Sequence, residues 1–511
     1  MRRSRSEPEI PTVAEPASTR HAKLAAAVDR LRIEDAFAAR GVVSTVGDGV
    51  ARVVGLDDVG YEELVTFDSG VVGMAYELAP DETGVILLSG PGGVVAGDGA
   101  RRLDQLPAIP FGAALLGRVV DPLGSPLDGG PPVEASERRN IFESPPELIA
   151  RRPVDRPVHT GVTVIDAAIP IGRGQRELIV GDRNVGKTSL ALDIIAAQRP
   201  GDPCCVYVAI GQPLSRILAI RETLARAECL DNVVVVGADA SLTPGMKYLA
   251  PYAGATIAEG LAGIHGDALV VYDDLSKHAD AYRELALLLD RPSGREAYPG
   301  DIFHIHAELL ERAAALRDGR SITAIPIVET TESDIAAYIP TNLISIADGQ
   351  IYLDTARFER DERPAVDVGK SVSRIGGAAQ PFAIRAASRN LRILLSRFAS
   401  LEALTRVGLE LEESTRTALA RGRILRELLR QPTLSPRSIG RQLVELTAVW
   451  EGWLDGLSPR EAAAAMVRVL DRVRRDSPEL LDAFDETKIP PPEWMSQLER
   501  IVRANRLTGA R

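Results

Sequence analysis

The chain has 511 residues, of which 45% are apolar and 26% are charged. This usage is ordinary for globular proteins, so it excludes a disordered, collagen-like or coiled-coil chain as a whole. The formal net charge of −11 argues against a large surface that coats nucleic acid. The cysteines are too few and too clustered for a disulfide framework, which favours a reducing, cytosolic compartment; they are Cys204, Cys205 and Cys229.

The first residues differ in composition from the rest of the chain. Residues 1–20 are rich in Pro, Ser and charge and lack the apolar segment of a secretory signal, so we predict a disordered tail. Apolar positions through residues 23–39 predict one short helix. The first predicted segment, residues 1–34, holds the tail and most of this helix. No apolar run approaches the roughly 18 residues that a membrane-spanning helix needs.

Residues 35–106 are predicted to form a small all-β domain. Runs rich in β-branched residues, such as VVSTV, VARVV and GVILL, alternate with turn sequences such as GDG, DETG and GPGG. Short strands at this spacing are typical of a sandwich or a barrel. Because the segment is short, we favour a barrel of six strands.

Residues 107–387 alternate between short apolar runs and helical stretches, which indicates a parallel sheet with helices on both faces. The strand-like runs are RELIV, CCVYVAI, NVVVVG, ALVVY and ITAIPIV. From residue 388 to 511 the apolar positions follow helical periodicity, so we predict a helical domain. Its breaks are expected at Pro432, Pro436, Pro459 and Pro490–Pro492.

The sequence GDRNVGKTS matches the phosphate-loop pattern G-x-x-x-x-G-K-[ST] between a predicted strand and a predicted helix. Gly181 and Gly186 are expected to let the backbone curl, so that successive N–H groups point at the phosphates. Lys187 supplies a positive charge to the β- and γ-phosphates, and Thr188 offers a hydroxyl to Mg²⁺. The predicted contacts to ATP or ADP are Gly181, Asp182, Arg183, Asn184, Val185, Gly186, Lys187, Thr188 and Ser189.

A phosphate loop of this kind works with a carboxylate at the end of a neighbouring buried strand, which orients the metal ion. The run ALVVYDD supplies one, so we predict that Asp273 holds Mg²⁺ through a water molecule and that Asp274 gives polar support. The predicted fold is therefore multidomain. It has an N-terminal β-barrel, a central α/β P-loop (RecA-like) nucleotide-binding domain and a C-terminal α-helical domain.

From about Val42 to Ser435 the chain resembles the α subunits of F-type ATP synthases. The resemblance rests on the order of the three domains and on long strings such as VGDGVARVVGLDDV, GRGQRELIVGDRNVGKTS, DRPSGREAYPGDIF and AAYIPTNLISIADGQIYL. It implies a subunit of an ion-translocating, two-sector ATPase that makes or consumes ATP, coupled to H⁺ or Na⁺ flow. The implied cofactors are ATP or ADP and Mg²⁺.

The resemblance also implies partners and a location. The partners are a catalytic β subunit in an alternating three-plus-three ring, a γ shaft and peripheral-stalk subunits, and no nucleic acid. The implied location is the cytoplasmic face of the cell membrane, which the chain reaches only through the complex.

The strand after the P-loop helix indicates which nucleotide subunit this is. In the catalytic subunits of the family that strand ends in a Glu, which polarises the attacking water. Here the run VYVAI is followed by Gly211 and Gln212. A neutral amide can orient water but cannot act as a base. The resemblance therefore implies a non-catalytic, regulatory site that binds Mg-ATP and hydrolyses it poorly.

Other residues match functional positions of the family. Arg374, in SVSRIGG, matches the arginine finger that reaches into the neighbouring catalytic site and neutralises charge on the transferring phosphoryl group. Ser371 matches a position that the family needs for activity. Phe358 and Arg363 match positions that line the adenine pocket, and Gln431 matches a purine-facing glutamine of the helical domain.

The chain departs from the family pattern at GQPLSRI, Lys370, ARFERDE and Thr433, which favours a divergent or second-copy complex. The sequence also bears on three alternative functions. A catalytic homohexameric export-type ATPase would need a Glu at position 212. An RNA-translocating ring ATPase would need exposed aromatic side chains on a basic groove. A scaffold with an inactive P-loop is opposed by the intact Lys187 and Thr188.

Overall fold

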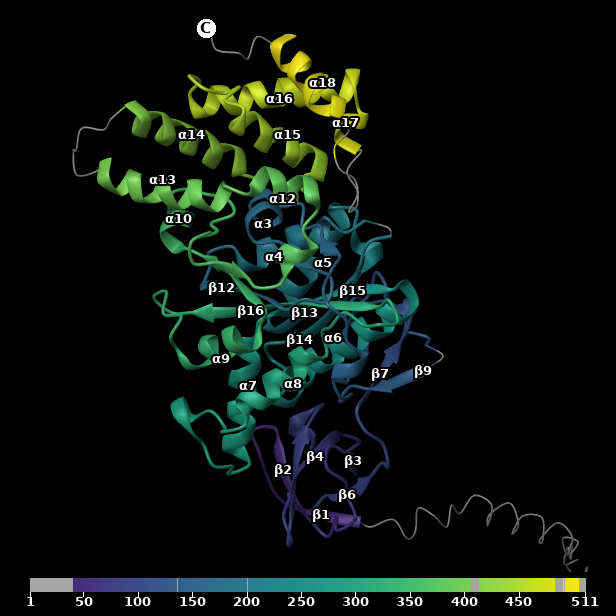
Figure 1. The fold of residues 1–511 in the computed structure, drawn as a ribbon. Helices are drawn as coiled ribbons and strands as arrows, with labels where there is room; N and C mark the ends of the chain where they lie inside the picture. Colours follow the sequence, from purple (N-terminus) through teal and green to yellow (C-terminus); the bar gives the residue numbers. More distant parts are fainter. Residues whose placement is uncertain are drawn as a thin grey trace, which may run out of the picture.

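The computed structural model describes residues 40–504 except 136, 200, 406–412, 483–489 and 491. Within these residues a β-barrel, an α/β domain and a helical domain follow one another along the long axis of the molecule (Figure 1). This arrangement confirms the predicted fold class. The predicted tail and helix before residue 40 lie outside the described residues, and the predicted domain limits stay predictions.

The barrel closes from six strands in the order β1-β2-β5-β4-β3-β6, as the turn spacing predicts. Its strands are β1 (Arg40–Gly47), β2 (Val50–Val54), β3 (Leu64–Phe67), β4 (Val72–Leu78), β5 (Thr83–Leu87) and β6 (Gly99–Arg102). Small and β-branched side chains fill the interior, and Val53, Val65 and Val85 are fully buried there. Closure leaves no strand edge open to pairing with another chain.

The central domain is built on an eight-stranded sheet in the order β18-β17-β12-β16-β15-β13-β14-β8. Its strands are β8 (Val119–Val120), β12 (Glu177–Asp182), β13 (Cys204–Gln212), β14 (Val233–Asp239), β15 (Asp267–Asp273), β16 (Ser321–Thr330), β17 (Gly349–Leu353) and β18 (Val372–Ser373). All neighbours pair in parallel except β17 and β18, which are antiparallel. The five predicted strand runs became β12 to β16.

Helices cover both faces of this sheet, as predicted (Figure 1). They are α3 (Thr163–Ala168), α4 (Lys187–Ala196), α5 (Leu214–Arg226), α6 (Pro244–His265), α7 (Leu275–Leu288), α8 (Ile302–Glu311), α9 (Tyr338–Ile346) and α10 (Thr355–Glu359). Side chains of α4 and α5 join one buried core, which continues into the helical domain. Those of α6, α7 and α8 join a second core on the opposite face.

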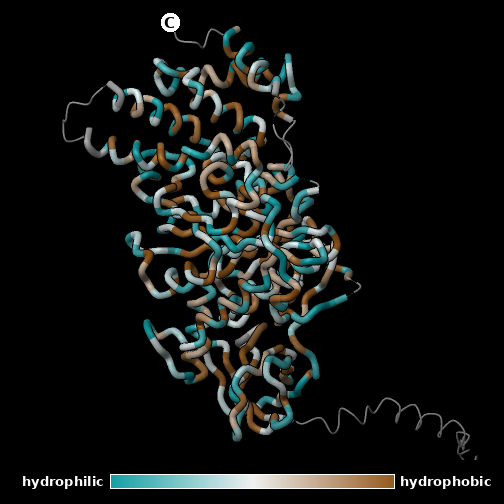
Figure 2. Tube along the Cα trace, in the orientation of Figure 1, coloured by the Kyte–Doolittle hydropathy of each residue, from teal (hydrophilic) through white to brown (hydrophobic). Residues whose placement is uncertain are grey.

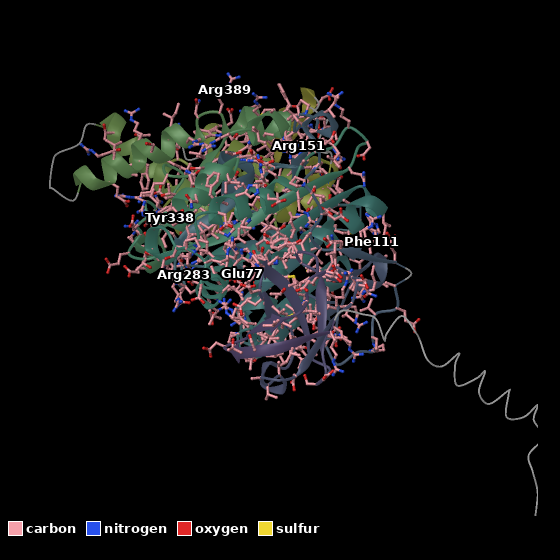
Figure 3. All side chains as sticks on the ribbon, turned by 90° about the horizontal axis from the view of Figure 1, so that it is seen from below. Glu77, Phe111, Arg151, Arg283, Tyr338 and Arg389 are labelled. Carbon is pink, nitrogen blue, oxygen red and sulfur yellow. The ribbon has the colours of Figure 1, made fainter. Side chains whose placement is uncertain are left out.

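Shorter strands connect these parts: β7 (Ala108–Phe111) pairs with β9 (Glu137–Asn140), and β10 (Pro157–Val158) pairs with β11 (Ile171–Gly172). The barrel is tied to the central domain through Arg52, whose guanidinium lies 2.7 Å from Glu82 of the barrel and 2.7 Å from Asp290 after α7. Figure 3, seen from below relative to Figure 1, shows Glu77 near the middle of the molecule, between Phe111 on one side and Arg283 on the other.

The rest of the described chain is helical, as its periodicity predicts. The helices are α11 (Gly376–Ala379), α12 (Phe382–Ser388), α13 (Leu391–Thr405), α14 (Glu413–Leu429), α15 (Ile439–Trp450), α16 (Pro459–Asp476), α17 (Glu479–Asp482) and α18 (Pro492–Ala504). Prolines mark their limits: Pro432 and Pro436 lie between α14 and α15, and Pro459 begins α16. Ser458 closes a capping box with Glu461 at the start of α16.

Hydrophobic residues concentrate in the interior of the sheet and along the inner sides of the helices, whereas hydrophilic residues dominate the outside (Figure 2). Among the described residues, none of the helices has both the length and the apolar character required to cross a bilayer.

Candidate nucleotide-binding site

The P-loop connects β12 to α4 through the turn Arg183–Gly186. The turn requires left-handed backbone at Asn184, with φ of 64°, and at Gly186, with φ of 96°. Gly181 serves a different purpose, because a Cβ atom there would lie 2.8 Å from the carbonyl oxygen of Leu353 in β17. The expectation that both glycines curl the loop is therefore correct for Gly186 only. Gly181 allows two strands to approach.

Lys187 lies buried under the turn, at the first position of α4. Its Nζ atom donates to the carbonyl oxygens of Gly181, at 2.9 Å, and Asp182, at 2.6 Å. The Oε1 atom of Glu329 is 3.7 Å away. Burial lowers the pKa of Lys187, while the charge of Glu329 opposes that shift. The ammonium group is thus held in place beside the loop. Phosphate oxygens bound there would balance its positive charge.

The opposite side of the loop gathers oxygen atoms. Thr188 Oγ1 donates to Asp273 Oδ2 at 2.7 Å, and the hydroxyl of Tyr207 donates to the same carboxylate oxygen. Gln212 Nε2 donates to the carbonyl oxygen of Asp273 at 2.9 Å, while its buried Oε1 has no partner among the described residues. A hydroxyl, a carboxylate and an unpaired amide oxygen are hard oxygen donors, so these residues fit a Mg²⁺ ion.

Asp274 gives the polar support that the sequence predicts, but as a helix cap. Its Oδ1 accepts from the backbone N–H of Lys277 at 2.9 Å and so caps the start of α7. Burial, together with the neighbouring charge of Asp273, raises the pKa of Asp274 to about 7.

These groups open into one cavity of about 620 Å³. Asp273, predicted to hold the metal ion, lines it, as do most of the predicted nucleotide contacts: Arg183, Asn184, Val185, Gly186, Lys187, Thr188, Ser189, Gln212, Phe358, Arg363 and Gln431. Gly181 and Asp182 do not line the cavity. The carboxylate of Asp182 instead accepts hydrogen bonds from Thr330 at 2.6 Å, Ser333 at 2.9 Å and Thr355 at 3.0 Å, so it anchors the loop to its neighbours.

Two side chains from α10 and the loop after it build another wall of the cavity. The guanidinium of Arg363 lies 3.7 Å from the centre of the Phe358 ring and donates to the Phe358 carbonyl oxygen at 2.7 Å. Gln431, from the segment after α14, also lines the cavity. Its Nε2 atom donates to the carbonyl oxygens of Gly161 and Ser435, each at 2.7 Å, so both donor hydrogens are used inside the chain and only its oxygen could accept from a purine. That it faces a purine stays a prediction.

Four further residues line the cavity or support its metal side, and the sequence did not single them out: Glu329, Tyr207, Arg216 and Lys277. Glu329 directly follows the run ITAIPIV, so the reasoning that found Asp273 could have found it. Tyr207 lies in the middle of a strand. Only the pairing of β13 with β15, which sequence does not reveal, brings it to Asp273.

Arg374 and Ser371 lie apart from this cavity, at the sheet edge formed by β17 and β18. Arg374 is exposed, and its guanidinium donates to the carbonyl oxygens of Ala347, at 3.3 Å, and Ile344, at 3.5 Å. Ser371 is fully buried: its hydroxyl donates to Asp367 O at 2.6 Å and accepts from Tyr352 N–H at 2.9 Å. The Ser371 hydroxyl is thus held inside the chain, and its importance for activity stays a prediction.

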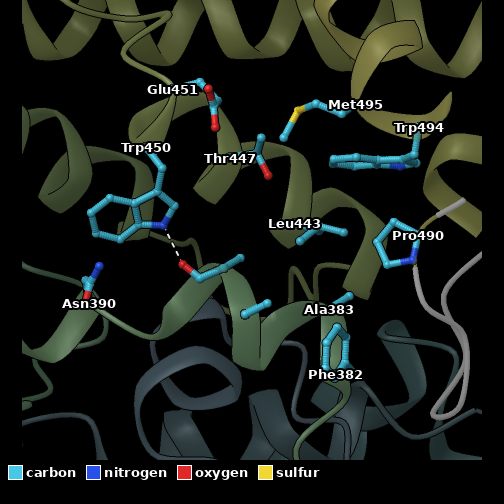
Figure 4. A pocket seen from close by; sticks show the side chains of 12 residues that line it. Phe382, Ala383, Asn390, Leu443, Thr447, Trp450, Glu451, Pro490, Trp494 and Met495 are labelled. Atoms are coloured by element: carbon cyan, nitrogen blue, oxygen red, sulfur yellow. Dashed lines mark hydrogen bonds between the residues drawn. The ribbon is translucent and has the colours of Figure 1, made fainter. Parts of the chain in front are cut away.

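A second cavity, of about 460 Å³, lies in the helical domain between α12, α15 and α18 (Figure 4). Its walls are mostly apolar and include Phe382, Leu443, Trp450, Trp494 and Met495. The indole N–H of Trp450 donates to the carbonyl oxygen of Ala387 across its floor. No lysine or arginine lines this cavity, so it does not offer a phosphate site.

Comparison with known proteins gives three matching family models. They are the β-barrel domain of the ATP synthase alpha/beta family, over residues 37–104, its nucleotide-binding domain, over 161–373, and the C-terminal domain of the alpha/beta chain, over 380–505. The ATP synthase subunit alpha of Caldanaerobacter subterraneus is 45% identical over 465 residues, 90% of this chain and 92% of the relative. That of Pediococcus pentosaceus is 45% identical over 454 residues, 88% of this chain and 90% of the relative.

Proposed function

We propose a function for this chain, which belongs to the family of ATP synthase α subunits. It binds Mg-ATP without hydrolysing it, and it assists catalysis in a neighbouring subunit. As an α subunit, the chain is part of a multi-subunit, membrane-associated ATP synthase and binds ATP or ADP through its nucleotide-binding domain. Its complex serves ATP synthesis and hydrogen ion transport.

The observation that carries the proposal is the chemistry around Gln212. Its amide is neutral and is held by Asp273, so it cannot take a proton from an attacking water. The nearby Glu329 faces Arg183 at 3.4 Å and Lys187 at 3.7 Å, so its carboxylate is already engaged by two cations. Asp274 is occupied as the cap of α7. Asp193 also lines the cavity and accepts from the backbone N–H of Leu434 at 2.5 Å. Among the described residues, the cavity thus combines phosphate binding with carboxylates that are each held by a hydrogen bond or by a cation.

The roles of the other residues follow from their positions. Backbone N–H groups at the start of α4 and the ammonium of Lys187 bind phosphate oxygens. Thr188 and Asp273 would hold Mg²⁺, which neutralises the phosphate charge when it is bound. The face of Phe358, backed by Arg363, offers an apolar surface to an adenine ring.

We propose further that Arg374 acts on the nucleotide of a neighbouring catalytic β subunit. It is exposed at a sheet edge and does not line its own cavity, while its backbone N–H is anchored on Asp348 O at 3.0 Å. The buried hydroxyl of Ser371 holds the segment before Arg374 in place through its two hydrogen bonds. This role requires an alternating three-plus-three ring, around a γ shaft and attached to peripheral-stalk subunits, at the cytoplasmic face of the membrane.

Equilibrium binding and phosphate release by the isolated full-length chain test the first part. We expect Mg-ATP to bind with negligible release of phosphate. Lys187→Ala should weaken binding and leave the fold intact, while Lys370→Ala, at an exposed lysine outside the cavity, serves as the control. Rapid hydrolysis by the pure chain, free of any partner subunit, would overturn the proposal.

A further inference from the structure

Arg216 is a cation of the nucleotide cavity to which the proposed function gives no role. It lies in the first turn of α5, just after β13 ends at Gln212. Its side chain lines the cavity, and its Nη2 atom donates to Thr188 Oγ1 at 3.3 Å. The guanidinium therefore lies beside the P-loop hydroxyl that faces Asp273, at the phosphate-binding end of the cavity.

Arg216 differs from the other cations that line this cavity. Each of the others has a carboxylate partner within 4.0 Å: Arg183 and Lys187 have Glu329, Lys277 has Asp274, and Arg363 has Asp361. For Arg216 no carboxylate within salt-bridge distance is found in the part of the chain that the structure describes. The preceding Gln212 is neutral and does not fill that role. A positive charge without a counterion, aimed into a phosphate site, is available to an anionic ligand.

We propose that Arg216 binds the terminal phosphate of a nucleoside triphosphate held by this P-loop, and so makes the site prefer ATP to ADP. This inference rests on the proposed nucleotide site, in which Arg216 would be the residue that distinguishes ATP from ADP. The N–H groups of the loop contact phosphates that ATP and ADP share. Thr188 is the hydroxyl that would help to hold Mg²⁺, whose charge would neutralise the terminal phosphates. A guanidinium beside it reaches the γ position, and its planar fork matches two phosphate oxygens.

The test compares the affinities of the full-length chain and its Arg216→Ser variant for Mg-ATP and Mg-ADP by isothermal titration calorimetry. The variant should bind ATP about tenfold more weakly, the size expected for a charge-assisted hydrogen bond. Its ADP affinity should stay within about twofold of the wild type. Arg216→Lys should recover only part of the ATP affinity, because an ammonium lacks the planar fork.

Arg226→Ser is the matched control, because Arg226 lies in the last turn of the same helix and bonds to Glu222 O there. Both of its affinities should equal those of the wild type. An unchanged ATP-to-ADP ratio in Arg216→Ser, or equal weakening of both nucleotides, would overturn the inference. If the wild type bound neither nucleotide, the nucleotide site itself would be wrong instead. Thermal melting checks the fold, and Arg216→Gln carries the same comparison if the Ser variant does not fold.

Discussion

At the scale of single residues, Arg374 carries the largest expected effect on turnover. Its guanidinium is exposed and held by two long hydrogen bonds, of 3.3 and 3.5 Å, which it can exchange for a neighbour's phosphate. A transition-state arginine of this kind is worth about 10³–10⁵ in rate. Arg374→Ala should therefore collapse steady-state ATP turnover of the assembled complex while nucleotide binding to this chain is unchanged. Arg374→Lys should rescue little.

Turnover is measured on complexes whose subunit composition has been verified by native mass spectrometry. Arg468→Ala, at an exposed position of α16, is the control and should leave turnover at the wild-type rate. Near-normal turnover in a fully assembled Arg374→Ala complex would rule out the arginine-finger role.

A second prediction at this scale concerns pH. His278 is fully buried, 3.2 Å from His306, and burial lowers its pKa from 6.5 to about 4. Between these two values the unfolded chain takes up a proton that the folded chain refuses, so stability falls as pH drops from about 6.5 to about 4. His278→Gln removes this titration. The free energy of unfolding of the variant should therefore decrease less steeply with falling pH, by up to about 1.4 kcal/mol per pH unit.

Chemical denaturation at several pH values between 7 and 4 measures this slope. His304→Gln, at an exposed position of the same helix as His306, should leave the slope unchanged. If His278→Gln lost stability with falling pH as steeply as the wild type does, His278 would not be a source of acid sensitivity.

At the scale of elements, the approach of β12 to β17 leaves no room for a side chain at Gly181. A Cβ atom would lie 2.8 Å from Leu353 O and 2.9 Å from Val185 Cγ2, both too short for ordinary contact. Gly181→Ala should therefore destabilise the chain by about 1–3 kcal/mol and weaken nucleotide binding through the displaced loop. Gly263→Ala, in α6 with its nearest neighbour at 3.9 Å, is the control and should not destabilise. Equal stability of the two variants would contradict the packing argument.

The same elements show what sequence can and cannot predict. Strands β12 to β16 are apolar runs buried on both faces, so their residues alone locate them. Strands β8 and β18 have two residues each, too few for any periodicity. Lys187, Thr188 and Asp273 belong to local patterns and were found. Glu329 follows an apolar run and could have been found in the same way. Tyr207 could not, because its contact with Asp273 depends on the strand order of the sheet, which long-range packing decides.

At the scale of the whole molecule, the exposed apolar side chains point to surfaces that another subunit covers. Leu148 and Ile149, in the segment before α3, are 85% and 73% exposed. Phe382 in α12 and Ile393 in α13, the helices that follow the Arg374 segment, are 60% and 67% exposed. Large apolar side chains this open to water are costly unless a partner buries them. They therefore favour a ring in which this chain is flanked by other subunits.

Replacing Leu148 and Ile149 together by Ser should weaken assembly and spare the nucleotide site, because neither side chain lines its cavity. Burial of such a side chain contributes about 1.5–3 kcal/mol, so losing two should reduce association at least about a hundredfold. Co-expression with the other subunits, followed by native mass spectrometry, measures the fraction of chain incorporated. Val467→Ser, 55% exposed on α16, is the control and should assemble normally. Full assembly of the double variant would show that this segment faces solvent in the complex. Particles that contain only this chain would contradict the alternating ring.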